Sequence, residues 1–334
     1  MGLSPKLGKL LGGYRHRLSA LQNYLPAKRI GIGRNVKVSR RVLRPPYFLT
    51  LLVQDNCNLS CHNCNMGAPD MPAASVEPAA LYRSLQRLKS HYRPRTVYVQ
   101  GGEALLHPEL DEIFRVARQS GVAPHLTLLT NATLLHQLSE RGWRSIDALE
   151  ISVYPSSGVD AAQISTIQRQ ASRWGVKVTA YRYDSFRVSM LPRQTGDINM
   201  VNRIYRSCEV AHLWGCHTLY GDRFFKCSQT IFAPRIAGSN ARHSADEDGI
   251  LIDDSPGLHQ RLYAYLDSKQ PLKGCAYCLA TAGVASPHRM LHNGEACVTP
   301  TTSVDELIDR DKLEQLEKGF GRYVETRAVI DGEG

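Results

Sequence analysis

Between residues 48 and 181 the sequence alternates between short apolar segments and longer amphipathic ones. The short segments have the length and composition of buried strands, whereas the longer ones repeat apolar side chains at three- and four-residue steps, as helices do. The expected strands are 48–53, 96–100, 124–130, 148–153 and 176–181, and the expected helices are 78–91, 108–120, 132–141 and 161–174. This alternation favours an α/β fold with a parallel sheet, and five such units predict a partial barrel.

The loop after the first expected strand contains three cysteines. Cys57, Cys61 and Cys64 have the spacing C-x3-C-x2-C. In barrels of βα units, active-site residues lie on loops at the C-terminal ends of the strands. Thiolates are soft ligands that select zinc, copper(I) or iron–sulfur clusters. Three thiolates can hold three corners of a cubane and leave one iron free for a small chelating ligand. A structural zinc would need a fourth ligand, for which His62 is the nearby candidate.

Two other strand ends carry residues that suit a polar ligand. The second strand ends in Gly101-Gly102-Glu103, and the third ends in Thr130-Asn131. Glycines allow the backbone to approach a ligand closely. A carboxylate or carbonyl oxygen accepts hydrogen bonds from an ammonium group. We therefore expect these turns to form a ligand site with the cysteine loop.

Together these features resemble the radical S-adenosylmethionine (radical SAM) superfamily. Residues 100–110 read QGGEALLHPEL, which is similar to the family's GGEPLL-HPEL stretch with Ala104 in place of the usual proline. The resemblance covers residues 47–280 and implies a partial (β/α)6 TIM-like barrel. It implies that a 4Fe–4S cluster is bound by Cys57, Cys61 and Cys64 and that its free iron chelates S-adenosylmethionine (SAM). In the family, SAM is contacted by elements that correspond here to Gly101, Gly102, Glu103, Asn131 and Ser152.

The chain departs from the family pattern at two positions. Tyr154 stands where an Asp often follows the strand-4 element, and Asn63 replaces an aromatic residue that packs on adenine in the family. We therefore expect Arg182 or Tyr183, at the end of the fifth strand, to contribute cofactor contacts. The scattered histidines are interpreted as structural side chains rather than catalysts, namely His62, His212, His217 and His288.

The remaining cysteines follow the point near residue 185 where the alternation breaks. Their order is a cysteine, a glycine, a cysteine and then a Cys-x2-Cys pair, which resembles the SPASM/twitch extension of the family. The gap between Gly221 and Cys227 is one residue longer than in the family, and of the later SPASM cysteines only Cys297 follows. The resemblance implies one auxiliary 4Fe–4S cluster rather than two, with the ligands Cys208, Cys227, Cys275 and Cys278.

Three roles are open for Cys216. It can replace Cys208 as a cluster ligand, because the sequence from His217 to Asp222 predicts a hairpin turn that brings Cys216 close to Cys227. It can also pack as a small apolar side chain. As the candidate catalytic residue, it can donate a hydrogen atom to a substrate radical, as in the family's epimerases. Since four thiolates also suit zinc, a zinc site at the later cysteines is a further alternative.

The expected organisation has four parts. A basic N-terminal helix and arm (1–46) precedes the barrel (47–205), and an auxiliary cluster domain (206–300) precedes a C-terminal helix and tail (301–334). Residues 232–257 are rich in Gly, Ser, Asp and Ala and are expected to form a loop or insertion. A helix is expected at 304–318.

Positive charge is concentrated at the N-terminus. Residues 1–54 carry eleven Lys or Arg and no Asp or Glu, and the whole chain has a formal net charge of +10. Such a field attracts anions, which favours an anionic substrate. The apolar spacing at 3–24 predicts an amphipathic helix that either docks on the domain or contacts a membrane surface. The arm contains no recognisable nucleic-acid-binding motif, so nucleic acid is not an expected partner.

Cysteine usage bears on the cellular compartment. Nine cysteines at grouped spacings suit metal binding in a reducing cytosol better than disulfides. No apolar segment approaches the length of a transmembrane helix, and no signal peptide is recognised. We therefore expect a cytoplasmic protein.

The resemblance implies an enzyme that reductively cleaves SAM to a 5′-deoxyadenosyl radical, which abstracts hydrogen from a substrate carbon. Twitch-bearing relatives oxidise or epimerise sugars and aminocyclitols. We therefore expect an oxidoreductase or epimerase that acts on a small polar substrate in a biosynthetic pathway, with a reductant such as flavodoxin or ferredoxin. The alternatives are modification of a ribosomally made peptide, whose enzymes often have a longer N-terminal recognition domain, and of a membrane-associated lipid. A zinc protein that binds nucleic acid is the remaining rival.

Overall fold

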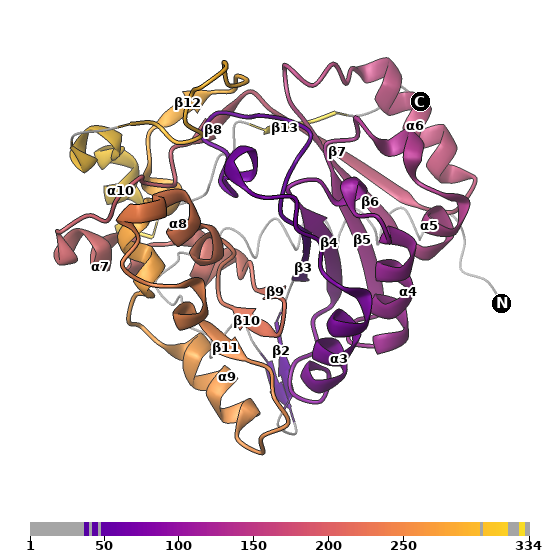
Figure 1. The fold of residues 1–334 in the computed structure, drawn as a ribbon, viewed down its shortest axis with the longest axis horizontal. Coiled ribbons are helices and arrows are strands. Elements are labelled where there is room, and N and C mark those ends of the chain that lie inside the picture. The colour runs from indigo at the N-terminus through magenta and orange to yellow at the C-terminus, as the bar shows by residue number, and fades with distance from the viewer. Residues whose placement is uncertain (1–36, 40–41, 46–47, 301–302, 320–326, 331–334) are drawn as a thin grey trace.

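The computed structural model describes residues 37–39, 42–45, 48–300, 303–319 and 327–330 (Figure 1). The amphipathic helix expected at 3–24 and most of the arm at 1–46 lie outside the described residues. Within the described part of the chain, no helix is long and apolar enough to cross a membrane.

The described residues form one large sheet with the strand order β11-β10-β9-β3-β4-β5-β6-β7-β13. The strands from β9 to β7 are parallel, whereas β10, β11 and β13 are antiparallel to their neighbours. The α/β fold with a parallel sheet is therefore confirmed. The strands of this sheet are β3 Phe48–Gln54, β4 Thr96–Gly101, β5 His125–Thr130, β6 Ala148–Val153, β7 Lys177–Tyr183, β9 Thr218–Tyr220, β10 Arg223–Phe225, β11 Gly249–Leu251 and β13 Arg327–Val329.

Two small antiparallel pairs complete the strands. β1 Lys37–Ser39 pairs with β2 Val42–Arg44, and β8 Ser185–Arg187 pairs with β12 Ala285–Pro287. In the large sheet, the sixth parallel strand is β9, which pairs with β3 at the start of the βα series. Strands from the region expected to form the auxiliary cluster domain thus continue the sheet of the barrel region.

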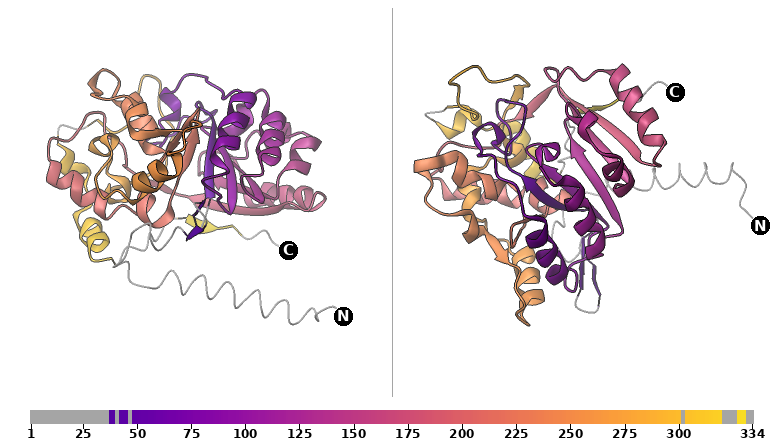
Figure 2. Two further views of the ribbon diagram at one scale, coloured as in Figure 1. Left: turned by 90° about the horizontal axis from the view of Figure 1, so that it is seen from below. Right: turned by 45° about the vertical axis from the view of Figure 1, so that its right-hand side comes forward.

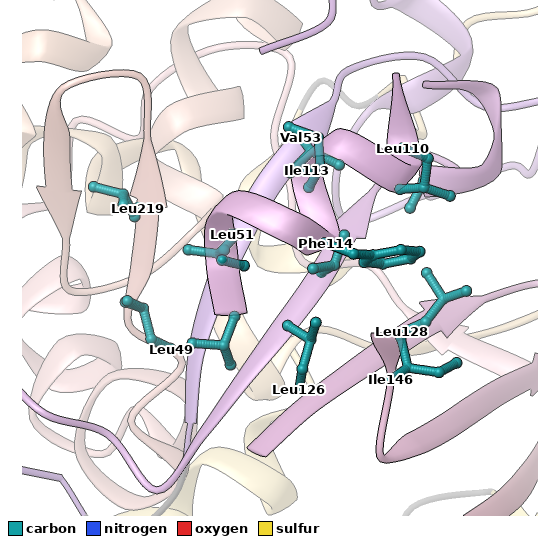
Figure 3. Close-up of a cluster of buried hydrophobic side chains, with 14 of the residues drawn as sticks. Leu49, Leu51, Val53, Leu110, Ile113, Phe114, Leu126, Leu128, Ile146 and Leu219 are labelled. Atoms are coloured by element: carbon teal, nitrogen blue, oxygen red, sulfur yellow. The ribbon is translucent and has the colours of Figure 1, made fainter. Parts of the chain in front are cut away.

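Four helices connect the parallel strands and lie on one side of the sheet (Figures 1 and 2), and the later helix α9 Leu258–Asp267 packs into the same apolar cluster. Their apolar faces pack on the strands. Phe114 is fully buried over Leu126 and Leu128 of β5, with Leu51 of β3 in the same cluster (Figure 3). β3 is buried along almost its whole length, whereas β4 and β6 alternate between buried and half-buried residues, so one of their faces is more accessible than the other. The helices are α3 Pro78–Leu88, α4 Leu110–Ser120, α5 Glu140–Ser145 and α6 Ala161–Ser172.

The C-terminal elements form two further apolar clusters. The helices are α7 Ile198–Arg206, α8 Gln229–Ala237, α9 Leu258–Asp267 and α10 Arg310–Glu317, with a π-helical turn at Val210–Trp214. Short 3₁₀ turns lie at Ala68–Asp70, Ala104–Leu106, Leu135–Gln137, Gly238–Asn240, Ala245–Asp248, Lys273–Tyr277, Ala280–Ala282 and Val304–Leu307.

Three element predictions were wrong in detail. The helix expected at 132–141 begins only at Glu140, because the Ser139 side chain caps it by accepting from the Gly142 N–H. Residues 232–257 are not simply a loop, since α8 extends to Ala237 and β11 joins the sheet. The helix expected at 304–318 is interrupted, because the Asp309 side chain caps a new helix, α10.

Candidate functional site

The cysteine loop 57–64 leaves the C-terminal end of β3, and its three thiols lie near one another. Burial raises the pKa of all three, that of Cys57 to about 11, and the neighbouring Cys64 raises the pKa of Cys57 and Cys61 further. The Leu59 N–H donates to Cys57 Sγ at 3.4 Å, and Asn131 Nδ2 lies 3.6 Å from the same sulfur. Because a metal binds thiolates, its binding must displace the protons that burial retains here.

This donor set suits an iron–sulfur cluster. Such clusters are held by cysteine thiolates and tuned by hydrogen bonds to their sulfurs, and the loop provides both. In the described residues, no three His, Cys, Asp or Glu side chains are grouped as the ligands of one metal ion. The thiolates of a cubane bind different irons and stand further apart. Three cysteines on one loop, with hydrogen-bond donors at Cys57 Sγ, suit the cluster ligands that the family resemblance implies.

Asn63 explains one departure from the family pattern. Its backbone has φ = 56°, a left-handed conformation that asparagine tolerates better than an aromatic residue does. Its side chain is buried, accepts from the N–H and hydroxyl of Thr299, and donates to Ser286 Oγ at 3.1 Å. Asn63 therefore attaches the cysteine loop to a distant part of the chain.

That distant part is residues 286–299, which we term the clamp segment. Its backbone runs along the cysteine loop: Leu291 N–H donates to Ser60 O at 2.7 Å, and His62 N–H donates to Arg289 O at 3.0 Å. Cys297 lies here, not with the other late cysteines. It is fully buried, and its thiol donates to Cys61 O at 3.7 Å. Sequence reasoning missed the clamp segment because no local pattern signals pairing between residues so far apart.

Gly101 and Gly102 hold the ends of β3 and β4 together. The Gly102 N–H donates to Gln54 O at 2.8 Å, and the Glu103 N–H donates to Asn56 O at 3.0 Å. A Cβ on Gly102 would lie 2.3 Å from Asn56 O, and one on Gly101 would lie 2.6 Å from Gln54 O. Only glycine permits this close approach, so the motif positions the segment that leads into Cys57.

The Glu103 carboxylate is occupied by contacts within the protein. It accepts from Leu105 N–H at 3.0 Å, Thr130 Oγ1 at 2.8 Å and Asn131 N–H at 2.8 Å. Burial raises the pKa of Glu103, and these hydrogen bonds oppose that rise. The side chain thereby joins the ends of β4 and β5 beside the cysteine loop.

The other predicted cofactor residues differ in their distance from the loop. Asn131 contacts it directly, because its Nδ2 donates to Asn58 Oδ1 at 2.9 Å. Ser152 hydrogen-bonds Tyr154, whose pKa is raised by burial and by the nearby Cys61. Tyr183 lies beside Tyr154, with ring centroids 5.9 Å apart. By contrast, Arg182 is exposed and ion-paired with Asp184 at 2.7 Å.

A second group of thiols lies in the C-terminal region. Burial raises the pKa of each, to about 11 for Cys208 and about 12 for Cys216 and Cys278. Cys208 is the central member, since it raises the pKa of every other thiol in the group through its proximity. The predicted hairpin is confirmed as β9–β10, and it places Cys216 beside Cys227. The group consists of Cys208, Cys216, Cys227, Cys275 and Cys278.

Lys226 lies against this group and is almost completely buried. Its Nζ donates to Tyr205 Oη at 2.8 Å and to Ser268 O at 3.0 Å. Burial lowers the pKa of Lys226 to about 8, while the nearby Cys275 and Cys208 act to raise it. None of the ion pairs among the described residues includes this ammonium group. The nearby Asp267 carboxylate also acts to raise this pKa, and thiolates in this group would add to the compensation of the buried cation.

Among the comparisons with known proteins, a family model covers the N-terminal motifs. The sequence model of the Radical SAM superfamily matches residues 51–156. Among solved structures, BtrN in complex with AdoMet and 2-DOIA is 15% identical, with coverage of 70% of this chain and 93% of BtrN and a TM-score of 0.44. Streptococcus suis SuiB bound to S-adenosylmethionine is 16% identical and has a TM-score of 0.34. That match covers 53% of this chain and 40% of SuiB. No curated protein matches the sequence.

Proposed function

We propose that this protein is a SAM-dependent iron–sulfur enzyme of the radical SAM superfamily, whose sequence model matches residues 51–156. We further propose that the enzyme uses an auxiliary cluster to oxidise or epimerise a small polar substrate. When bound, the first cluster would supply the electron for reductive cleavage of SAM, and SAM would supply the radical that removes hydrogen from the substrate. The residues that would hold this cluster are Cys57, Cys61 and Cys64.

The protein's own residues would prepare this site. The Gly102 backbone fixes the start of the cysteine loop, and Asn131 orients Cys57 through its side-chain amide. Tyr154 and Tyr183 place aromatic surface close to the loop, which favours exclusion of water from a reactive radical. The cofactor carries the difficult chemistry, and these groups position it.

One observation carries the proposal of an auxiliary cluster: five thiols lie close to Cys208 or include it, and three of the five, Cys208, Cys227 and Cys275, neighbour the buried Lys226. Four of them would serve as ligands, namely Cys208, Cys227, Cys275 and Cys278. The Cys208 and Cys278 sulfurs each accept from a backbone N–H, of Ala211 at 3.5 Å and of Ala280 at 3.2 Å. Such hydrogen bonds, together with a buried positive charge, set the potential of an iron–sulfur cluster. A cluster of this kind could accept an electron from a substrate radical.

The iron content of anaerobically purified protein tests this proposal. We expect about eight irons per chain in the wild type and about four after replacement of either cysteine set by alanine, the first being Cys57/Cys61/Cys64 and the second Cys208/Cys227/Cys275/Cys278. Zinc in place of iron at the second set, or a wild type with about four irons, would contradict the auxiliary cluster.

The substrate class needs a separate assay. The proposal of a sugar- or aminocyclitol-like substrate rests on the twitch-like order of the late cysteines. The reconstituted enzyme, reduced by flavodoxin or ferredoxin, should form 5′-deoxyadenosine in a manner stimulated by such a compound. Stimulation by a precursor peptide or by lipid vesicles alone would reject the small polar substrate while leaving the radical chemistry intact.

A further inference from the structure

His288 of the clamp segment contacts a cysteine of the first loop. Its Nε2 lies 3.3 Å from Cys61 Sγ, and its backbone N–H donates to Asp184 O at 2.9 Å. The residues involved are more than two hundred positions apart, so the contact depends on the tertiary fold. Antiparallel pairing of Met290 with Cys61 fixes the clamp segment next to the same cysteine.

Aromatic neighbours hold the His288 ring in place. It stacks on Tyr154 with centroids 4.9 Å apart and planes 12° apart, and it meets Phe186 edge-on at 5.1 Å. The residue is 8% exposed. A ring packed on two sides has little freedom to rotate away, so the contact with Cys61 has a defined geometry.

The direction of the hydrogen bond between His288 and Cys61 follows from the chemistry of the two groups. A thiolate can only accept a hydrogen bond, so the ring proton belongs on Nε2 when Cys61 is ionised. The other nitrogen, Nδ1, is buried and has no hydrogen-bond partner among the described residues, so no contact there requires a proton on that atom.

We propose that His288 is a positioning residue for the first cluster, which donates Nε2–H to the Cys61 thiolate and raises the cluster's reduction potential. This inference rests on the proposed function, because it requires a cluster at Cys57, Cys61 and Cys64. Reduction adds negative charge to the cluster and its sulfurs, so an N–H···S bond stabilises the reduced form more than the oxidised form. The bond also limits the movement of Cys61 as a ligand.

Two substitutions separate the hydrogen bond from the packing. His288→Phe keeps an aromatic ring between Tyr154 and Phe186 but removes the donor, whereas His288→Gln keeps an N–H donor at the depth of Nε2. The matched control is His62→Phe, on the same loop, whose ring contacts Asn63 Nδ2 rather than a thiol in the described structure.

The measurement is an EPR-monitored redox titration of the full-length protein, using the signal that changes when SAM is added. We expect His288→Phe to lower the equilibrium constant for one-electron reduction of the cluster about tenfold, which corresponds to a reduction potential about 59 mV lower at 25 °C. His288→Gln should restore most of the difference, and His62→Phe should show none. An unchanged potential in iron-loaded His288→Phe would overturn the inference and leave the proposed function intact.

The iron content of the two His288 variants separates the same two roles, hydrogen bonding and packing. If His288→Phe binds no cluster but His288→Gln does, the donor is required and the inference is supported. If neither variant binds a cluster, an N–H donor at this position is not sufficient for cluster binding and the inference fails. If the iron bound by the wild type does not depend on Cys57, Cys61 and Cys64, or if the wild type binds no iron, the proposed function itself is rejected.

Discussion

Arg235 of α8 forms an ion pair with Asp55, and Nη1 and Oδ2 are 2.5 Å apart. Tyr220 of β9 donates to the same carboxylate oxygen at 2.8 Å and accepts from Arg235 Nη2 at 2.7 Å. Asp55 precedes Cys57 by two residues, and α8 begins two residues after Cys227. The ion pair therefore links the two cysteine sites through the backbone segments that carry them.

Removal of Arg235 should destabilise the fold strongly. Asp55 is 1% exposed and its Oδ1 has no hydrogen-bond partner among the described residues, so Arg235→Ala leaves a buried carboxylate with the Tyr220 hydroxyl as its remaining side-chain donor. We expect a loss of about 3–5 kcal/mol in the free energy of unfolding, measured by urea denaturation. Asp55→Asn in the Arg235→Ala background should recover part of this loss. A change below about 1 kcal/mol would show that water or another group compensates the carboxylate.

Glu103→Gln should lower the free energy of unfolding, and any effect on SAM binding should follow from this loss of stability. Glutamine can accept on one side-chain oxygen only, so one of the buried donors from Leu105, Thr130 or Asn131 loses its partner. We expect a cost of about 1–3 kcal/mol in unfolding free energy. Thermal unfolding and calorimetric SAM binding should be measured on the same preparations. Lost SAM affinity at unchanged stability would instead mean that the carboxylate itself recognises the cofactor.

Cys208 and Cys216 should differ as ligands of the auxiliary cluster. Cys208 lies close to all other thiols of its group, so Cys208→Ala should lower the iron content by about four per chain. Cys216→Ala should retain the wild-type content. The reverse pattern would assign Cys216 as the ligand, and equal retention in both variants would indicate that either thiol can serve.

Lys226→Met should make the auxiliary cluster harder to reduce. The buried ammonium group stabilises added negative charge on the neighbouring thiolates. Its removal is therefore expected to lower the equilibrium constant for one-electron reduction about tenfold, which a redox titration would show as a potential about 59 mV lower. Lys273→Met is the matched control, because Lys273 lies two residues from Cys275 but is exposed and screened by water. Equal shifts in the two variants would argue against a specific role for the buried charge.

His217 should make stability depend on pH. Burial lowers the pKa of His217 to about 3, and the ring hydrogen-bonds Tyr92 Oη at 2.6 Å. Between this value and the unfolded pKa near 6.5, the unfolded chain binds a proton that the native protein excludes. His217 therefore reduces stability as the pH falls from about 6.5 towards 3, by about 1.4 kcal/mol per pH unit.

The double variant Tyr92→Phe/His217→Leu should lack this part of the pH dependence. Both proteins share the same carboxylates, so the difference between their unfolding free energies from pH 6.5 to pH 4 isolates the histidine. Parallel stability profiles would show that His217 is protonated in the folded protein.

Local sequence patterns were sufficient for the strand–helix series and for the ends of the strands. The predicted strand 96–100 is β4 Thr96–Gly101, and the predicted strand 148–153 is β6. Side-chain alternation and helical periodicity arise within a few residues, so a single sequence contains them. The boundary error at α5 arose because the capping residue Ser139 was not recognised.

Contacts between distant segments could not be predicted in this way. Sequence spacing identified Cys57, Cys61 and Cys64, but it gave no sign that His288 would contact Cys61 or that Cys297 would lie beside this loop. It also gave no sign that Lys226 would be buried, since an isolated lysine beside a cysteine is usually exposed.

The sequence alone determined the α/β class, the cysteine loop at the end of β3 and the β9–β10 hairpin, because each depends on neighbours along the chain. The tertiary structure decided that β9 pairs with β3, that the clamp segment runs along the cysteine loop and that Arg235 compensates Asp55. These relationships depend on which surfaces the chain buries against one another, and that choice is made by the packing of the whole molecule rather than by any local segment.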